Sequence, residues 1–420
     1  MKLLHTLSFA IIQFLFWPVR WLSFPLIHKL GAFLGRLLFY SSSKFRKRAL
    51  SNLALASDLK LHQDALYSIA KQSLENLMIT CLEYFKFASV KQVAPTVRCE
   101  NPEVAADLMK QGKPVIFFCG HQANWEVLFL EGTSRMPGVA IGRPVKNDIL
   151  YQWLLSIREK FGGKMISPRN AAREGLRALK QGSFLGIVGD QGMPDSGFSS
   201  SFLGRSAWTS PLPAILSHRT GSPIIVATTR RVDGKYLIHY SDPIWPNKTA
   251  PLDQEIDRMM KQALHFLQES IKQEPGQWLW SHNRWKQQLP GKIKRLYRQE
   301  SLCIILPDER QLFEQLNAQL GTFRKIYPLE FIFCKVPRRF ADLCTVKDAV
   351  VEPYDTVNDL LNIDLRFKLV FNLTSFSCLH SHYKKCAAFA VLDIKELQRL
   401  AGSNTSDLSY LLNKALLHAT

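Results

Sequence analysis

The pattern of apolar and polar positions divides the chain into an apolar start, a helical stretch and a long alternating region. Residues 3–40 are mostly apolar and aromatic, and Pro18, Arg20 and Pro25 are among the few interruptions. Residues 50–95 carry apolar side chains at spacings of three and four, which predicts helix. Beyond Pro95, short apolar runs alternate with amphipathic stretches. This alternation predicts an α/β fold, in which a mixed sheet is covered by helices.

The predicted elements of the alternating region fall into two groups. The first has strands at 115–119, 139–142, 184–188, 223–230 and 236–240, and helices at 104–111, from 127 onward, 151–161, 169–181 and 252–271. Residues 192–211 are dense in Gly, Pro and Ser, which predicts an irregular loop. The second group has strands at 302–306, 331–335 and 367–373, and helices at 309–323, 393–400 and 407–417.

A chain of 420 residues is long for one domain, and the basic linker 291–298 separates the two groups of elements. We therefore expect a membrane-anchoring helical segment at 1–40, a first domain at 41–298 and a smaller α/β domain at 299–420. The smaller domain has no Gly-rich phosphate loop, and its function is not predicted.

The apolar start leaves several membrane arrangements open. Residues 3–17 are fewer than the roughly 20 that a straight spanning helix needs. Extending the stretch to residue 30 gives the length but places Arg20 near its middle, so a tilted span, a re-entrant helix and an interfacial helix all remain. Trp17 and Trp21 suit each of these. A cleaved signal peptide is disfavoured, because only Lys2 precedes the apolar part. The basic residues at 44–48 predict that everything after residue 41 lies in the cytoplasm.

The chain is strongly basic, with a formal net charge of +19. This predicts polyanionic partners, among which nucleic acid, anionic lipids and acidic carrier proteins all qualify. Zinc-finger spacings and RNA-binding aromatic motifs are missing from the sequence, which argues against nucleic acid. The eight cysteines are scattered without a C-x-x-C pair, a pattern typical of reduced thiols in the cytosol.

The candidate chemistry lies in residues 115–126, VIFFCGHQANWE. The apolar run ends at Gly120, so His121 follows the carboxyl end of a predicted strand and Glu126 begins a predicted helix. A neutral imidazole titrates near working pH, and a carboxylate on its other nitrogen fixes its tautomer. We expect Glu126 to turn back and orient His121, which would then remove a proton from a hydroxyl group. The alternative is a purely structural hydrogen bond between a buried His and a helix-capping Glu.

Residues 120–126, GHQANWE, resemble the His-x4-Asp/Glu motif of the glycerol-phosphate acyltransferase superfamily, in the form typical of the lipid A late acyltransferases. Further segments resemble the family's motifs in the same order over residues 1 to about 298. They are GRP with Asn147 at 142–147, REKFGG at 158–163, GDQ at 189–191, FLG at 202–204 with Leu203 in place of Phe, and WSHNRWK at 280–286.

The resemblance implies transfer of a fatty acyl chain from acyl carrier protein to a hydroxyl of a lipid A precursor, without metal or cofactor. It places the enzyme in the bacterial inner membrane, with its catalytic domain on the cytoplasmic side. The family's essential Arg and Asp fall on Arg158 and Asp190. The predicted site therefore combines catalytic and substrate-binding residues: His121 and Glu126 for catalysis, and Arg158, Asp190, Arg143, Asn124 and Gln191 for substrate.

Two other functions remain open at this point. One is an acyltransferase with a phospholipid or other glycolipid as acceptor. The other is a bifunctional or scaffolding protein whose residues after 300 bind a sugar nucleotide or a partner.

Three further groups of residues have both a functional and a structural interpretation. Cys119 lies close to His121, but its place in a strand favours a buried small residue over a thiol nucleophile. Cys378, His380, His382 and Cys386 are four soft ligands, but period-two spacing would crowd the first three on one strand face, which disfavours zinc. The last group, Arg169, Arg173 and Arg177, lines one side of a predicted helix, either as a solvated face or as a surface for phosphate or acidic protein.

Overall fold

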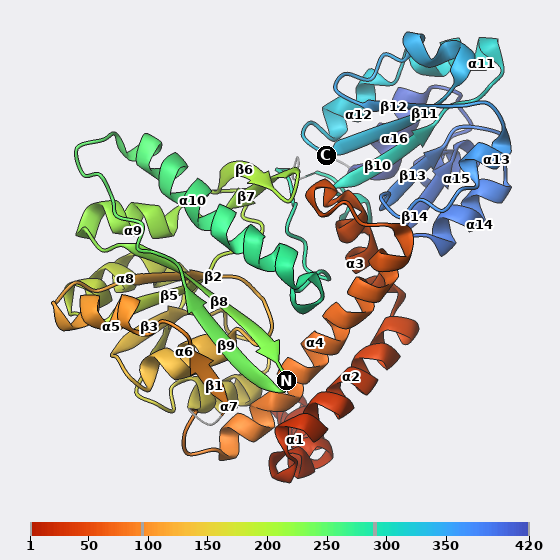
Figure 1. Ribbon diagram of the computed structural model, residues 1–420. Coiled ribbons are helices and arrows are strands. Elements are labelled where there is room, and N and C mark those ends of the chain that lie inside the picture. Colours follow the sequence, from red (N-terminus) through yellow and green to blue (C-terminus); the bar gives the residue numbers. More distant parts are fainter. Residues whose placement is uncertain (1, 94–95, 289–291, 419–420) are drawn as a thin grey trace. The chain divides into compact units, whose positions relative to one another are not determined.

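The computed structural model describes residues 2–93, 96–288 and 292–418. The chain forms two compact units, each built from two segments (Figure 1). The first unit combines Met1–Ser41 with Tyr67–Arg284, and the second combines Ser42–Leu66 with Trp285–Thr420. The mixed α/β architecture predicted from the alternating pattern is confirmed. The sequence predicts that the first domain begins at residue 41. In the structure, residues 42–66 pack with the second unit instead.

The apolar start of the chain forms α1 (Lys2–Phe16), a 3-10 turn η1 (Trp17–Trp21) and α2 (Phe24–Ser41). Leu3–Trp21 is long and apolar enough to cross a membrane, and only 6% of it is buried in the protein. Helix α2 lies directly against α4 (Gln63–Ser89). A Cβ atom on Gly35 would lie 2.2 Å from the Glu75 backbone, so glycine permits this close approach.

The first unit is built on a seven-stranded sheet with the order β1-β9-β8-β2-β5-β3-β4. Its neighbouring strands run parallel, apart from the antiparallel pair β8 and β9. The strands are β1 (Val97–Cys99), β2 (Ile116–Cys119), β3 (Gly138–Ile141), β4 (Lys164–Ile166), β5 (Phe184–Val188), β8 (Ile224–Val232) and β9 (Lys235–Tyr240). Every strand predicted here is present, and the short edge strands β1 and β4 are additional.

Helices cover both faces of this sheet (Figure 1). They are α5 (Glu103–Lys110), α6 (Glu126–Thr133), α7 (Asp148–Arg158), α8 (Ala171–Lys180), α9 (Leu212–Thr220) and α10 (Leu252–Gln273). Strand β2 is buried at all four positions between these layers. Its continuous apolar run is what a central parallel strand requires.

The prediction of an irregular loop at 192–211 is wrong. Residues Phe198–Phe202 and Arg205–Thr209 form an antiparallel hairpin, β6 and β7. Both turn residues have positive φ, 51° at Leu203 and 83° at Gly204. Two-residue hairpin turns with positive φ usually carry Asn-Gly or Asp-Gly. Leucine at the first turn position hides this hairpin from sequence analysis.

The second unit contains a five-stranded, fully parallel sheet with the order β12-β11-β10-β13-β14. Its strands are β10 (Ser301–Ile305), β11 (Phe331–Pro337), β12 (Val350–Tyr354), β13 (Leu369–Asn372) and β14 (Ala390–Asp393). Its helices are α3 (Ser43–Leu55), α11 (Arg310–Asn317), α12 (Gly321–Ile326), α13 (Val357–Leu360), α14 (Cys378–Lys385), α15 (Ile394–Ala401) and α16 (Leu408–Leu416). The edge strands β12 and β14 were not predicted.

Helix α3 belongs to this unit through specific polar contacts. Lys47 Nζ donates to the Ala388 carbonyl at 2.7 Å, and Ser51 Oγ donates to the Arg366 carbonyl at 2.9 Å. The Lys368 ammonium is fully buried and contacts Asn52 and Glu300. The basic stretch at 44–48 therefore contributes to packing as well as to charge.

The strand face expected for Cys378, His380 and His382 is wrong, because Cys378–Lys385 is the helix α14. Within the described parts of the chain, no group of three or more His, Cys, Asp or Glu side chains could hold a metal ion. All eight cysteines are free thiols.

Candidate active site

The turn after β2 positions His121 and is held by two distant segments. Ala123 has a positive φ of 47°, a strained conformation for alanine. Its N–H donates to the Gln277 carbonyl at 2.7 Å, and its carbonyl accepts from Asn76 Nδ2 at 2.9 Å. Gln122 exchanges hydrogen bonds with Ser270 of α10. The imidazole therefore projects from a rigid turn.

Asp190, at the end of β5, is the carboxylate that orients His121. Nδ1 of His121 lies 2.6 Å from Asp190 Oδ1, and the His121 backbone N–H donates to Oδ2 at 2.7 Å. Trp278 Nε1 also donates to Oδ2, at 2.8 Å. Only 2% of the Asp190 side chain and 13% of the His121 side chain are exposed.

The electrostatics of Asp190 favour its ionised form. Burial alone would raise its pKa, but attraction to His121 and the hydrogen bonds from that residue outweigh burial, with a smaller contribution from His282. The pKa of Asp190 is therefore held well below its ordinary value. An ionised carboxylate only accepts hydrogen bonds. Nδ1 of His121 is consequently the donor, and Nε2 carries the lone pair that can take a proton.

Glu126 does not orient His121, which corrects the expectation drawn from the spacing. Its carboxylate forms a two-pronged ion pair with Arg158, with Nη2 to Oε1 at 2.6 Å and Nε to Oε2 at 2.8 Å. Arg158 also donates to the Tyr84 hydroxyl at 2.9 Å. Glu126 is the first residue of α6 and its side chain extends toward the end of α7, so it is directed away from the imidazole.

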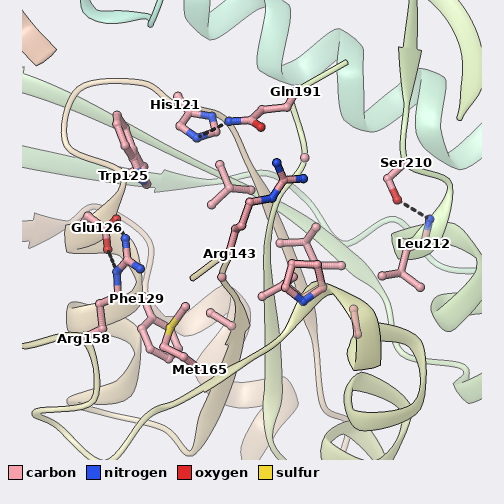
Figure 2. Close-up of a pocket in the computed structure, with 18 of the residues that line it drawn as sticks. His121, Trp125, Glu126, Phe129, Arg143, Arg158, Met165, Gln191, Ser210 and Leu212 are labelled. Atoms are coloured by element: carbon pink, nitrogen blue, oxygen red, sulfur yellow. Dashed lines mark hydrogen bonds and ion pairs between the residues drawn. The ribbon is translucent and has the colours of Figure 1, made fainter. Parts of the chain in front are cut away.

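A cavity of about 320 Å³ opens beside Nε2 of His121 (Figure 2). Trp125 packs edge-on against the imidazole, with ring centroids 4.6 Å apart. The amide nitrogen of Gln191 lies 3.2 Å from His121 Nε2 and donates to it. The lining combines these groups with the Glu126–Arg158 pair and an apolar wall, and includes Phe129, Ala140, Ile141, Arg143, Met165, Pro168, Ala171, Ile187 and Leu212.

Arg143 projects into this cavity, as Figure 2 shows. In the described residues it has no ion pair or side-chain hydrogen bond, whereas the other guanidinium in the cavity wall, Arg158, is neutralised by Glu126. Arg143 is therefore the available cation for an anionic substrate group.

Asn124 and Asp190 were predicted to bind substrate, but neither lines the cavity. Asn124 is 1% exposed, donates to Glu83 Oε2 at 2.7 Å and accepts from the Glu126 N–H at 3.1 Å. Its visible role is to join the turn to α4 and to the start of α6. Cys119 is buried, and burial raises the pKa of its thiol.

A second, smaller cavity of about 50 Å³ adjoins the first. Both are lined by Trp125, Phe129, Ala140, Ile187 and Val188, and the smaller one extends to the apolar side chains of Phe117, Cys119, Leu128, Phe184 and Ala227. The site therefore continues into the apolar interior between the sheet and α6.

Sequence reasoning assigned no role to three groups that shape the site. Trp278 holds Asp190, His282 lies parallel to His121 with ring centroids 6.0 Å apart, and Glu83 anchors Asn124. The segment at 280–286 drew attention to His282 as part of a motif. Glu83 gave a weaker signal, as the carboxylate in a row of polar residues with Asn76 and Thr80 along α4.

The fold and site define an α/β enzyme with a His–Asp pair at the carboxyl edge of its sheet, suited to activating a hydroxyl group. The model of the bacterial lipid A biosynthesis acyltransferase family matches residues 1–287, and the chain belongs to this family. It is similar to the lipid A biosynthesis lauroyltransferase of Escherichia coli (strain K12), at 24% identity over 281 residues, which are 66% of this chain and 90% of that protein. The chain is thus an acyltransferase of lipid A biosynthesis, with a lipid A precursor as its acceptor.

Proposed function

We propose that the enzyme transfers a fatty acyl chain from a thioester on acyl carrier protein to a hydroxyl of the lipid A precursor. The observation that carries the proposal is the His121–Asp190 contact of 2.6 Å beside the main cavity. With Nδ1 donating to an ionised carboxylate, Nε2 is the basic nitrogen and lies where a substrate hydroxyl can approach it.

In this mechanism Nε2 of His121 takes the hydroxyl proton while the oxygen attacks the thioester carbonyl carbon. The tetrahedral intermediate then collapses and its C–S bond breaks. The proton on Nε2 passes to the departing thiolate, so the products are an ester and a free thiol. Asp190 stays ionised and stabilises the imidazolium between the two steps. Gln191 must yield its contact with Nε2 to the incoming hydroxyl, and its amide remains nearby as a hydrogen-bond donor.

The charge and shape of the two cavities are consistent with a phosphorylated acceptor and a fatty acyl chain as substrates. Arg143 is positioned to bind a phosphate of the acceptor, since guanidinium groups pair well with phosphate oxygens. The smaller apolar cavity suits hydrocarbon, and we assign it to part of the acyl chain. The Glu126–Arg158 pair would hold the wall between α6 and α7 in place.

We further propose that the enzyme acts at the cytoplasmic face of the bacterial inner membrane. Exposed apolar side chains cover α1, η1 and α2, among them Leu3, Leu4, Leu7, Ile11, Phe14, Leu15, Trp17, Trp21, Leu26 and Phe33. Asn147 caps α7 and donates to the His5 carbonyl at 3.0 Å and to Ser8 Oγ at 2.9 Å. The apolar helix therefore contacts the same loop that carries Arg143, close to where a membrane-borne acceptor would enter.

The donor is tested with the purified full-length protein in detergent and a lipid A precursor as acceptor. The same acyl chain is offered on acyl carrier protein, on coenzyme A and on pantetheine, and the product is measured by mass spectrometry. We expect one added acyl chain, formed with the highest kcat/KM from acyl carrier protein. Equal or better use of the other two thioesters would contradict the proposed donor.

A further inference from the structure

A row of three unpaired arginines runs along α8 and its leading turn. Arg169 lies in the turn η3 (Pro168–Asn170), and Arg173 and Arg177 follow at intervals of four residues. Residues four apart share one face of a helix. All three side chains are exposed, and we call this set the arginine row.

The buried side of α8 lies opposite the arginine row and determines which way the arginines face. Ala171, Gly175 and Ala178 are buried against the unit. A Cβ atom on Gly175 would lie 2.9 Å from Leu185 of β5, so the helix is seated closely on the sheet. Rotation about the helix axis is thereby prevented, and the arginines must face solvent.

The arginine row differs from the charged surface of α10. On α10 the exposed cations pair with carboxylates one turn away: Lys261 with Asp257 and Lys272 with Glu269, each at 2.8 Å. In the part of the chain that the structure describes, no ion pair or side-chain hydrogen bond engages the arginine row. Its positive charge is therefore available to a partner.

The arginine row begins at the mouth of the main cavity. Pro168 and Ala171, on either side of Arg169, line that cavity together with His121. From Arg169 to Arg177 the helix rises about 12 Å, at about 1.5 Å per residue. The row therefore continues from beside the cavity along α8, over a length comparable to one short helix of a partner.

We propose that the arginine row is the docking surface for the acidic protein that carries the acyl thioester. This inference rests on the proposed function, because a carrier-bound thioester must reach His121 while the body of the carrier stays outside the cavity. The arginine row offers such a carrier a charged surface next to the cavity. Guanidinium groups form strong, directional pairs with carboxylates, so an acidic helix is the matching partner. Close pairing at the opening would also fix where the thioester arm enters.

The test compares two double charge reversals that change the net charge equally. Arg173→Glu/Arg177→Glu alters the arginine row, and Lys261→Glu/Lys272→Glu alters α10 as the matched control. Each full-length variant is assayed with acyl carrier protein and with acyl-pantetheine as donors, at low and at high salt. Binding of each variant to vesicles of phosphatidylglycerol and phosphatidylcholine is measured by sedimentation.

The arginine-row variant should raise KM for acyl carrier protein about tenfold or more at low salt, with little change in kcat, as expected when charge complementarity is lost. Its KM for acyl-pantetheine should match that of the control variant. The difference between the variants should shrink at high salt, where the Debye length falls from about 10 Å to about 3 Å.

Two results would overturn the docking surface. The first is an equal KM for acyl carrier protein in both variants. The second is loss of vesicle binding by the arginine-row variant while its KM for acyl carrier protein stays unchanged; this result would assign the row to the membrane. If acyl carrier protein were not the donor at all, the unaltered enzyme would not prefer it over acyl-pantetheine. That result is therefore distinct from failure of the docking surface.

Discussion

His121 and Asp190 stand at equivalent positions beyond two neighbouring strands. In the pairing of β2 with β5, Cys119 is opposite Val188, and each functional residue follows its strand partner by two positions. The parallel register alone therefore brings the imidazole and the carboxylate to the same point of the sheet edge. Short hydrogen bonds then lock them together at 2.6 and 2.7 Å.

Replacing Asp190 by Asn should lower kcat by about 10² to 10⁴, the range typical for loss of acid–base function. The introduced amide can donate a hydrogen bond to Nδ1 of His121. This would favour the tautomer with its proton on Nε2, and Nε2 could then no longer accept a proton from the hydroxyl. KM for both substrates should change little, because Asp190 does not line the cavity. A steady-state assay of the full-length variant provides the measurement. A change confined to KM would assign Asp190 to substrate binding.

The same residue predicts how stability depends on pH. The pKa of Asp190 is depressed in the folded protein, so its stabilising contribution is present above the unfolded value of about 4 and is lost as pH falls further. Thermal denaturation should therefore find wild type more stable than Asp190→Asn at pH 7, with a smaller gap near pH 3. A gap that stayed constant would contradict an ionised carboxylate.

Glu126 and Arg158 should behave as one buried ion pair. Removing either partner leaves an unpaired charge and should cost about 3–5 kcal/mol of unfolding free energy. The double replacement Glu126→Ala/Arg158→Ala should cost less than the sum of the two single replacements. Turnover of Arg158→Ala should fall at every salt concentration, because the pair is largely buried and poorly screened. Additive stability losses would contradict the coupling.

Glu83 should be a strong determinant of stability and turnover, although it does not contact the cavity. Its buried carboxylate accepts hydrogen bonds from Asn124 and Tyr236 and contacts His28 Nε2 at 2.7 Å. Glu83→Gln removes one oxygen acceptor and the negative charge from this buried cluster, at a cost of about 2 kcal/mol.

The matched control for Glu83→Gln is Glu75→Gln, which lies on the same helix. It removes an ion pair to the exposed Arg36, which solvent screens, so stability should change much less than in Glu83→Gln. Thermal denaturation and kcat are measured on both variants. Equal losses of stability and kcat in the two variants would show that the buried contacts of Glu83 contribute no more than an exposed ion pair.

The N-terminal helices should retain the protein in membranes. Leu3–Trp21 and the outer face of α2 expose more contiguous apolar surface than a soluble monomer tolerates. Fractionation should place the full chain in the membrane pellet, from which detergent releases it. Recovery as a monodisperse species without detergent would refute membrane attachment.

Local sequence pattern was sufficient for much of the fold. The strand at 184–188 was predicted with its observed bounds, because a central parallel strand is apolar at every position. His121 was correctly placed beyond β2 for the same reason. The hairpin β6–β7 was missed, since Leu203 occupies a turn position normally held by Asn or Asp.

The partners of the site residues depend on tertiary packing and were harder to predict. The pairing of His121 with Asp190 follows from the adjacency of β2 and β5, which sequence spacing does not encode. Glu126 was expected to meet His121 because it is close in sequence, but α7 places Arg158 nearer to its carboxylate. Likewise, residues 42–66 join the second unit through tertiary contacts, such as those of Lys47 and Ser51, that sequence spacing does not reveal.

The measurement that tests the central claim most directly is acyl transfer by His121→Ala, with Cys119→Ala as control. Both full-length variants are checked for folding by thermal denaturation, and product is measured by mass spectrometry with acyl carrier protein as donor. We predict that His121→Ala loses turnover by about 10² to 10⁴, as expected for removal of a general base, while Cys119→Ala stays active. Turnover of folded His121→Ala within a few fold of wild type would contradict the assignment of His121 as the base.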